Sequence, residues 1–76
     1  MTTDQMKQRL LENFPDGTVE VEDLTGTSNH FRVQVESGKF AGLSLLDRQK
    51  SVMAVFNNEV KSGEVHALSI KTIIKE

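Results

Sequence analysis

The sequence predicts a small α+β domain with the element order helix, strand, strand, helix, strand. Apolar residues recur every three or four positions in two segments and alternate with polar residues in three others, which are the periodicities of helices and strands. A chain of 76 residues has room for one core, so residues 1–76 are expected to form a single domain. The content of 37% hydrophobic and 26% charged residues is typical of a folded chain.

The first helix is predicted over residues 2–14. Thr2 and Gln5 have the spacing of a capping box, in which each side chain accepts a hydrogen bond from the backbone N–H of the other. Pro15 and Gly17 end the helix, because proline cannot continue it and glycine readily forms the left-handed turn that follows. Its apolar side is formed by Met6, Leu10, Leu11 and Phe14.

Two strands are predicted over residues 18–24 and 30–36, joined by a turn-rich loop. In the first strand, Val19 and Val21 alternate with acidic residues, so one face is buried and the other is in water. The second strand shows the same alternation, and the two are expected to form a hairpin. The core-facing residues of the second strand are Phe31, Val33 and Val35.

A second, longer helix is predicted from residue 44 to about residue 61. Ser44 is suited to cap it, and Asp47 occupies the acidic position of a capping box. Residues 57–58, both asparagine, weaken its end, and Gly63 terminates it. Its expected apolar side consists of Leu45, Leu46, Val52, Met53, Phe56 and Val60.

The last strand is predicted over residues 65–73 and is reached from the second strand through the long helix. Such a crossover favours parallel, neighbouring strands, so we expect a three-stranded mixed sheet with the helices on one face. The second and third strands then begin at the same end of the sheet. His30 begins the second strand and His66 the third, so the only two histidines in the chain meet at one edge.

The composition excludes several kinds of site. The chain has no cysteine, which rules out a disulfide framework, a thiolate zinc site and a cysteine nucleophile. This also fits a reducing compartment, and we expect a cytoplasmic protein without membrane contact, since no apolar run approaches the roughly 20 residues of a membrane helix. Neither glycine-rich nucleotide fingerprint is present, and no serine has an evident base, so no enzymatic activity is expected.

The two histidines are a candidate metal site. Neutral imidazole is a common ligand of zinc, copper and iron, but two ligands do not complete the coordination of any of these metals. Each residue also has a simpler explanation, His66 as a strand-end residue bonded to a backbone carbonyl and His30 as a solvated loop-edge residue. Either a partner completes the site or there is no metal site.

The basic residues offer a second candidate surface. Arg48, Lys50 and Lys71, with Lys61 and Lys75, would make a modest patch for the phosphates of a nucleic acid. The formal net charge of −2 weighs against such a role, because nucleic-acid-binding domains are usually basic. A solvated helix face is the simpler explanation of these residues.

Three segments of the chain resemble the BolA family. They are residues 29–33 (NHFRV), residues 40–48 (FAGLSLLDR) and residues 63–71 (GEVHALSIK). The phenylalanine-x-glycine-x-serine helix entry and the valine-histidine-alanine strand are its most specific parts. The resemblance implies a fold similar to the class II KH domain, with a short helical turn before the second helix. It also places His66 on the invariant histidine of the family and His30 on the ligand of its variable loop.

The resemblance further implies a function. Members of the BolA family pair with monothiol glutaredoxins that carry a Cys-Gly-Phe-Ser motif, and the pair holds a [2Fe–2S] cluster to which glutathione supplies one thiolate. His66 and His30 would then supply two nitrogens and the partner two sulfurs, a mixed ligation that raises the cluster potential. The isolated chain is expected to carry no cofactor. It would be a non-enzymatic adaptor in iron–sulfur cluster trafficking or iron-status signalling.

The alternative is a nucleic-acid-binding transcriptional regulator that uses the KH-like fold and the residues Arg48, Lys50 and Lys71. KH domains clamp a nucleic-acid backbone with a Gly-x-x-Gly loop, which this chain lacks. Fold likeness alone is a weak basis for a function. The adaptor is therefore the leading hypothesis.

Overall fold

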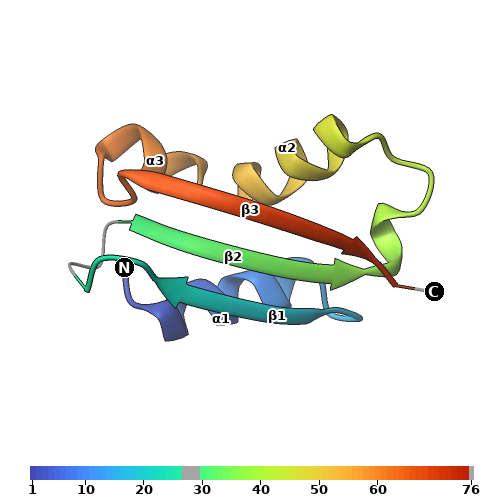
Figure 1. The fold of residues 1–76 in the computed structure, drawn as a ribbon, viewed down its shortest axis with the longest axis horizontal. Coiled ribbons are helices and arrows are strands. Elements are labelled where there is room, and N and C mark those ends of the chain that lie inside the picture. Colours follow the sequence, from blue (N-terminus) through green and yellow to red (C-terminus); the bar gives the residue numbers. More distant parts are fainter. Residues whose placement is uncertain (27–29, 76) are drawn as a thin grey trace.

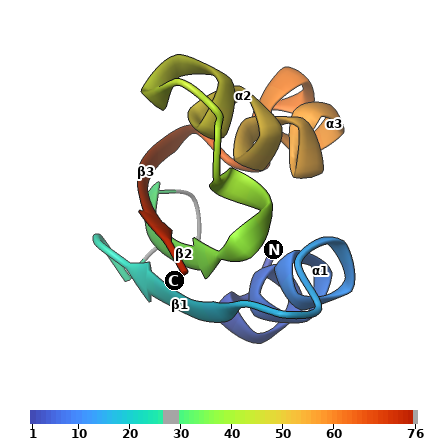
Figure 2. The same ribbon diagram turned by 90° about the vertical axis from the view of Figure 1, so that its right-hand side faces the viewer.

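The computed structural model describes residues 1–26 and 30–75, and in it three α-helices cover one face of a three-stranded sheet (Figures 1 and 2). Residues 27–29 of the predicted loop lie outside the described residues. The predicted order is confirmed, with a short 3-10 helix after the second strand and a division of the long helix. The elements are α1 (Thr3–Asn13), β1 (Thr18–Asp23), β2 (His30–Ser37), η1 (Gly38–Phe40), α2 (Leu45–Val55), α3 (Asn57–Ser62) and β3 (Ala67–Ile74).

The sheet is mixed and has the strand order β1-β2-β3. β1 pairs antiparallel with β2, and β2 pairs parallel with β3. The crossover through α2 and α3 therefore joins parallel neighbours, as a crossover connection favours. Both β2 and β3 begin at the same end of the sheet, the left end in Figure 1.

The core lies between the sheet and the helices. In β2, the central strand, alternate residues point inward, and directly opposite residues of neighbouring strands share this face. Fully burying each valine or phenylalanine side chain contributes about 1.5–3 kcal/mol. The buried apolar residues are Met6, Leu10, Phe14, Val19, Phe31, Val33, Val35, Phe40, Val52, Phe56 and Val65.

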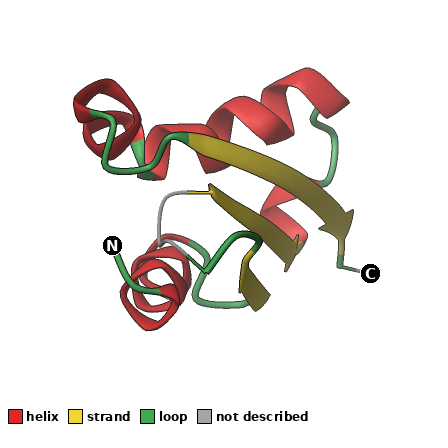
Figure 3. Ribbon diagram, turned by 60° about the vertical axis from the view of Figure 1, so that its left-hand side comes forward, coloured by secondary structure: helices red, strands yellow, loops and turns green. Residues whose placement is uncertain are grey.

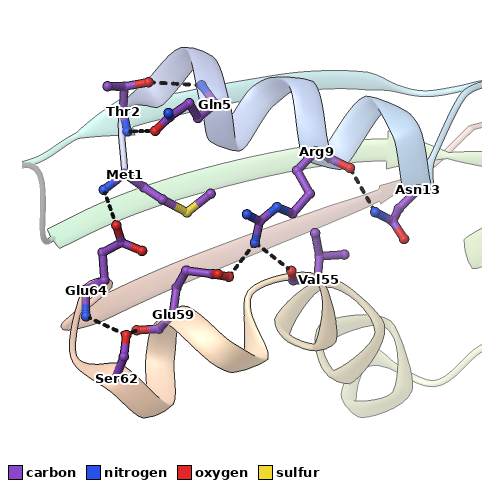
Figure 4. Close-up of polar contacts among 9 residues, drawn as sticks. All are labelled: Met1, Thr2, Gln5, Arg9, Asn13, Val55, Glu59, Ser62 and Glu64. Carbon is purple, nitrogen blue, oxygen red and sulfur yellow. Dashed lines mark hydrogen bonds and ion pairs between the residues drawn. The ribbon is translucent and has the colours of Figure 1, made fainter.

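Helix α1 begins with the predicted capping box. The Oγ1 of Thr2 accepts the N–H of Gln5 at 3.1 Å, and the Oε1 of Gln5 accepts the N–H of Thr2 at 2.9 Å (Figure 4). Two of the N–H groups that a helix N-terminus leaves without a partner are thus satisfied within the element.

The predicted long helix is wrong as a single element, because α2 ends at Val55 and α3 begins at Asn57. The residue between them, Phe56, has φ −113° and ψ 20° and lies fully buried. Asparagine is a weak helix former, and residues 57–58 are both asparagine. The break lets α3 run in a different direction from α2 and bring the chain to the start of β3 (Figure 3).

The expected apolar side of this segment is only partly buried. Val52 and Phe56 lie in the core, but Leu45 is 57% exposed and Leu46 is 62% exposed, and Val60 is exposed as well. Helix α2 approaches β3 most closely at its C-terminal end (Figure 1). Its first turn therefore lies away from the sheet. The three strands do not extend far enough to cover the leucines of this turn.

Asp16 connects the loop after α1 to the end of the sheet at which β2 and β3 finish. Its carboxylate accepts the N–H of Gly38 at 2.8 Å and the hydroxyl of Ser37 at 2.8 Å. Its carbonyl accepts the ammonium of Lys75 at 2.6 Å. The hydrogen bonds from Gly38 and then from Ser37 lower the pKa of the Asp16 carboxyl below its ordinary value.

Among residues 1–26 and 30–75, no helix combines the length and the apolar character needed to cross a membrane.

Candidate metal centre

His30 and His66 lie side by side at one end of the sheet. His30 is the first residue of β2, and the parallel register places it opposite Ala67, so that His66 immediately precedes the first paired residue of β3. The two ring centroids are 5.3 Å apart, and the ring planes are inclined by 71°. The topology therefore brings together two side chains that are far apart in the sequence, as predicted.

The alternation of side chains within the strands does not explain this contact. His30 has the outward parity of Arg32, whereas His66 has the inward parity of Leu68. The rings meet because His66 lies before the pairing begins, where the pleat no longer determines which way a side chain points. His66 is exposed and His30 is half-buried, so another protein can reach both.

The two histidines are incomplete as a metal site. Within the described part of the chain, no group of three or more histidine, cysteine, aspartate or glutamate side chains is placed to hold a metal ion. The sequence also has no cysteine. Because zinc and the irons of a cluster take four ligands in a tetrahedral arrangement, any such metal bound here needs ligands from a second molecule.

The ring separation fits two imidazoles on one metal ion. A metal–nitrogen bond of about 2.1 Å places a ring centroid about 3 Å from the metal, so two imidazoles at a tetrahedral angle have centroids about 5 Å apart. The observed 5.3 Å is close to this value. In Rieske centres, two histidines bind one iron of a [2Fe–2S] cluster. The donor set therefore fits the cluster that the sequence resemblance implies.

The family model described as BolA-like protein matches residues 10–76. The chain belongs to the BolA family. Over 76 residues it is 34% identical to an uncharacterized protein of Acinetobacter guillouiae, covering 100% of this chain and 88% of that one. It is 38% identical over 72 residues to the protein BOLA2 of Arabidopsis thaliana, covering 93% and 75% of the two chains.

The fold is also that of solved BolA structures. The BolA domain of SufE1 from Arabidopsis thaliana superimposes with a TM-score of 0.83 at 29% identity, covering 95% of this chain and 90% of that one. The predicted α+β class and the BolA resemblance are thus both confirmed.

The three basic residues singled out in this BolA-family chain do not share one surface. Arg48 is half-buried, and its Nε is buried without a hydrogen-bond partner among the described residues. Lys50 lines a shallow hollow of about 240 Å³ with Leu68 and Ile70 of β3. Lys71 follows Ile70 and so points to the other face of the strand, where it lines a different hollow beside two glutamates of β1.

One contact between α1 and α3 has no signal in the sequence. The guanidinium of Arg9 in α1 donates to the carboxylate of Glu59 in α3 (Figure 4). The two residues are 50 positions apart, and neither belongs to a motif. Only the tertiary structure, in which α1 and α3 lie on the same face of the sheet, brings them together.

Proposed function

We propose that this BolA-family chain is a non-enzymatic adaptor that binds a monothiol glutaredoxin and shares a [2Fe–2S] cluster with it. The observation that carries the proposal is the pair of imidazoles 5.3 Å apart in a chain that has no thiolate of its own. The resemblance of the sequence to glutaredoxin-binding BolA proteins supports it. The biological role would be iron–sulfur cluster trafficking or iron-status signalling.

The ligands come from both molecules. His66 and His30 supply two nitrogens, and the cysteine of a Cys-Gly-Phe-Ser glutaredoxin and the thiol of glutathione supply two sulfurs. Bound in this way, the cluster supplies one-electron chemistry at a potential higher than that of all-thiolate ligation. A reducing compartment keeps both thiols free, so we place the protein in the cytoplasm.

The two histidines have different parts in this proposal. His66 follows the buried Val65 and directly precedes the paired Ala67, so its backbone is held on both sides. His30 adjoins the loop between β1 and β2, and we expect its ligation to be weaker. Imidazole binds a metal only through an unprotonated nitrogen.

Visible circular dichroism tests the proposal directly. The chain is added to a cluster-loaded monothiol glutaredoxin, and the spectrum is expected to change as nitrogen ligands replace sulfur. His66→Ala should abolish this change and His30→Ala should reduce it. Ser69→Ala, an exposed substitution on β3, is the matched control and should behave like the wild type. The same spectral change in His66→Ala as in the wild type would rule out the ligand assignment.

A nucleic-acid-binding regulator has less support. The chain has a net charge of −2, and Lys50 and Lys71 line different hollows on opposite faces of β3. A titration with DNA over a range of salt concentrations distinguishes the two functions, because specific binding through phosphates weakens steeply with salt.

A further inference from the structure

Helix α3, which leads into the strand that carries His66, has little contact with the core. Of its described residues, Asn57–Ser62, none is buried, and no side chain among the described residues caps its N-terminus. The residues that flank it, Phe56 and Val65, are both fully buried. A helix of six residues is not stable by itself in water, so its position depends on contacts from elsewhere in the molecule.

Arg9 supplies such a contact from α1. Its Nη1 donates to the carboxylate of Glu59 and, at 3.4 Å, to the carbonyl of Val55. Its guanidinium carbon lies 5.8 Å from the ring centroid of Phe56. Figure 4 shows the Arg9 side chain extending from α1 to the junction of α2 and α3. The side chains of Arg9 and Glu59 are 37% and 16% exposed, so this ion pair is partly shielded from water.

Glu59 connects this contact to the metal-binding residue. Its carbonyl accepts the N–H of Val65 at 3.1 Å, and His66 is the next residue. The pairing of β3 with β2 begins only at Ala67. The sheet therefore holds His66 on its C-terminal side, and Glu59 holds it on its N-terminal side.

We propose that Arg9 is a positioning residue that acts through Glu59 to hold His66 beside the other histidine. The inference rests on the proposed function, because it assumes that the two imidazoles bind one metal. Where only a fraction of molecules has the competent arrangement, the apparent dissociation constant rises by the inverse of that fraction. If loss of the Arg9 contact reduces this fraction to about one tenth, metal affinity falls about tenfold.

Cu²⁺–iminodiacetate is a suitable probe, since the chelate leaves adjacent coordination positions that two imidazoles can occupy and no partner protein is needed. Binding is followed by electron paramagnetic resonance, well below the unfolding midpoint of each variant. Arg9→Met should bind the chelate about tenfold more weakly than the wild type. His66→Ala and His30→Ala should both lose the two-nitrogen signal.

Lys39 offers a matched control at the opposite end of the sheet. Its ammonium lies 5.9 Å from the ring centroid of Phe14 and donates to the carbonyl of Asn13 at 2.9 Å. Lys39→Met removes one positive charge, one cation–ring contact and one hydrogen bond to a main-chain carbonyl, as Arg9→Met does. We expect Lys39→Met to bind the copper chelate with wild-type affinity.

The thermal unfolding midpoint of each variant is measured together with its copper affinity. The comparison distinguishes a loss of positioning from a general loss of stability. Equal losses of copper affinity in Arg9→Met and Lys39→Met would overturn the inference, and so would wild-type affinity in Arg9→Met. If Arg9→Met does not fold, Glu59→Gln replaces it, because this substitution keeps the size of the side chain and removes only its charge. Glu59→Gln should then weaken copper binding by several-fold, and unchanged binding would overturn the inference.

The failure of the proposed function is seen in a different measurement. If the wild type binds the copper chelate through both histidines, and Arg9→Met weakens this binding, the inference holds even when the glutaredoxin cluster spectrum never changes. An unchanged cluster spectrum would then refute only the adaptor function and leave the inference about Arg9 standing. If the wild type alters the cluster spectrum and Arg9→Met matches it in both assays, only the inference fails.

Discussion

The free energy that couples Arg9 to Glu59 can be measured against a second arginine–glutamate pair in the same molecule. Arg32 and Glu22 face each other across β1 and β2 with an N–O distance of 3.0 Å, and their side chains are 55% and 61% exposed. The Arg9–Glu59 side chains are 37% and 16% exposed. The two pairs therefore differ in how far water screens the charges, and Arg9 also contacts the ring of Phe56 and the carbonyl of Val55.

The expected coupling energies follow from this difference in exposure. Exposed pairs contribute about 0.2–1 kcal/mol, and we expect a coupling energy within this range for Arg32–Glu22. For Arg9–Glu59, which makes the same kind of charge-assisted hydrogen bond, the lower screening raises the expected coupling to about 1–2 kcal/mol. In a domain of this size, 1 kcal/mol corresponds to a shift of about 4–8 °C in the unfolding midpoint.

Two double-mutant cycles test these values. One combines Arg9→Met with Glu59→Gln, and the other combines Arg32→Met with Glu22→Gln, with the free energy of unfolding taken from urea titrations. Because the two cycles use the same pair of substitutions, differences in side-chain chemistry cancel between them. A coupling for Arg9–Glu59 no larger than that for the exposed pair would refute the view that this contact holds α3 in place.

Three further predictions concern residues at the two ends of the sheet. In Gly17→Ala, the added Cβ would lie 2.6 Å from the main-chain oxygen of Glu36, so the backbone must move. We expect a loss of about 1–3 kcal/mol in the free energy of unfolding by urea, whereas a wild-type unfolding midpoint would contradict the close approach. The native pKa of Asp16 is lowered, so its contribution to stability is present above about pH 4 and is lost as the pH falls further. Asp16→Asn should therefore flatten the acid limb of the profile of stability against pH, and parallel profiles of the variant and the wild type would contradict this. Val65→Ala removes buried methyl groups and should cost about 2 kcal/mol, and it should also weaken copper–iminodiacetate binding. Val19→Ala, which truncates a core valine in β1, should lose similar stability without that effect on copper.

Local signals in the sequence predicted the elements well. The capping pair Thr2 and Gln5 marks the start of α1 because both of its hydrogen bonds form within one turn. The strands follow from alternation, which depends only on one face being buried. The placement of both histidines at one end of the sheet follows from the preference of a crossover for parallel strands, a rule that needs no knowledge of side-chain packing.

The prediction failed where the outcome depended on packing at a distance. Leu45 and Leu46 are apolar at helical spacing, yet they are exposed because the first turn of α2 lies away from the sheet. The helix breaks at Phe56 because the two asparagines that follow are weak helix formers and because the chain must turn back to reach β3. Periodicity marks an apolar face, but it does not say which part of that face another element covers.

By itself, the sequence determined the order of helices and strands in this BolA-family protein and showed two histidines and no cysteine. A metal bound by these histidines would therefore need further ligands from another molecule. Only the tertiary structure decided that the two rings lie 5.3 Å apart, because His66 precedes the paired residues of β3 and its direction is not set by strand alternation. It also decided that Arg9 meets Glu59. A contact between residues 50 positions apart depends on how helices pack against the sheet, and local periodicity along the chain does not reveal that packing.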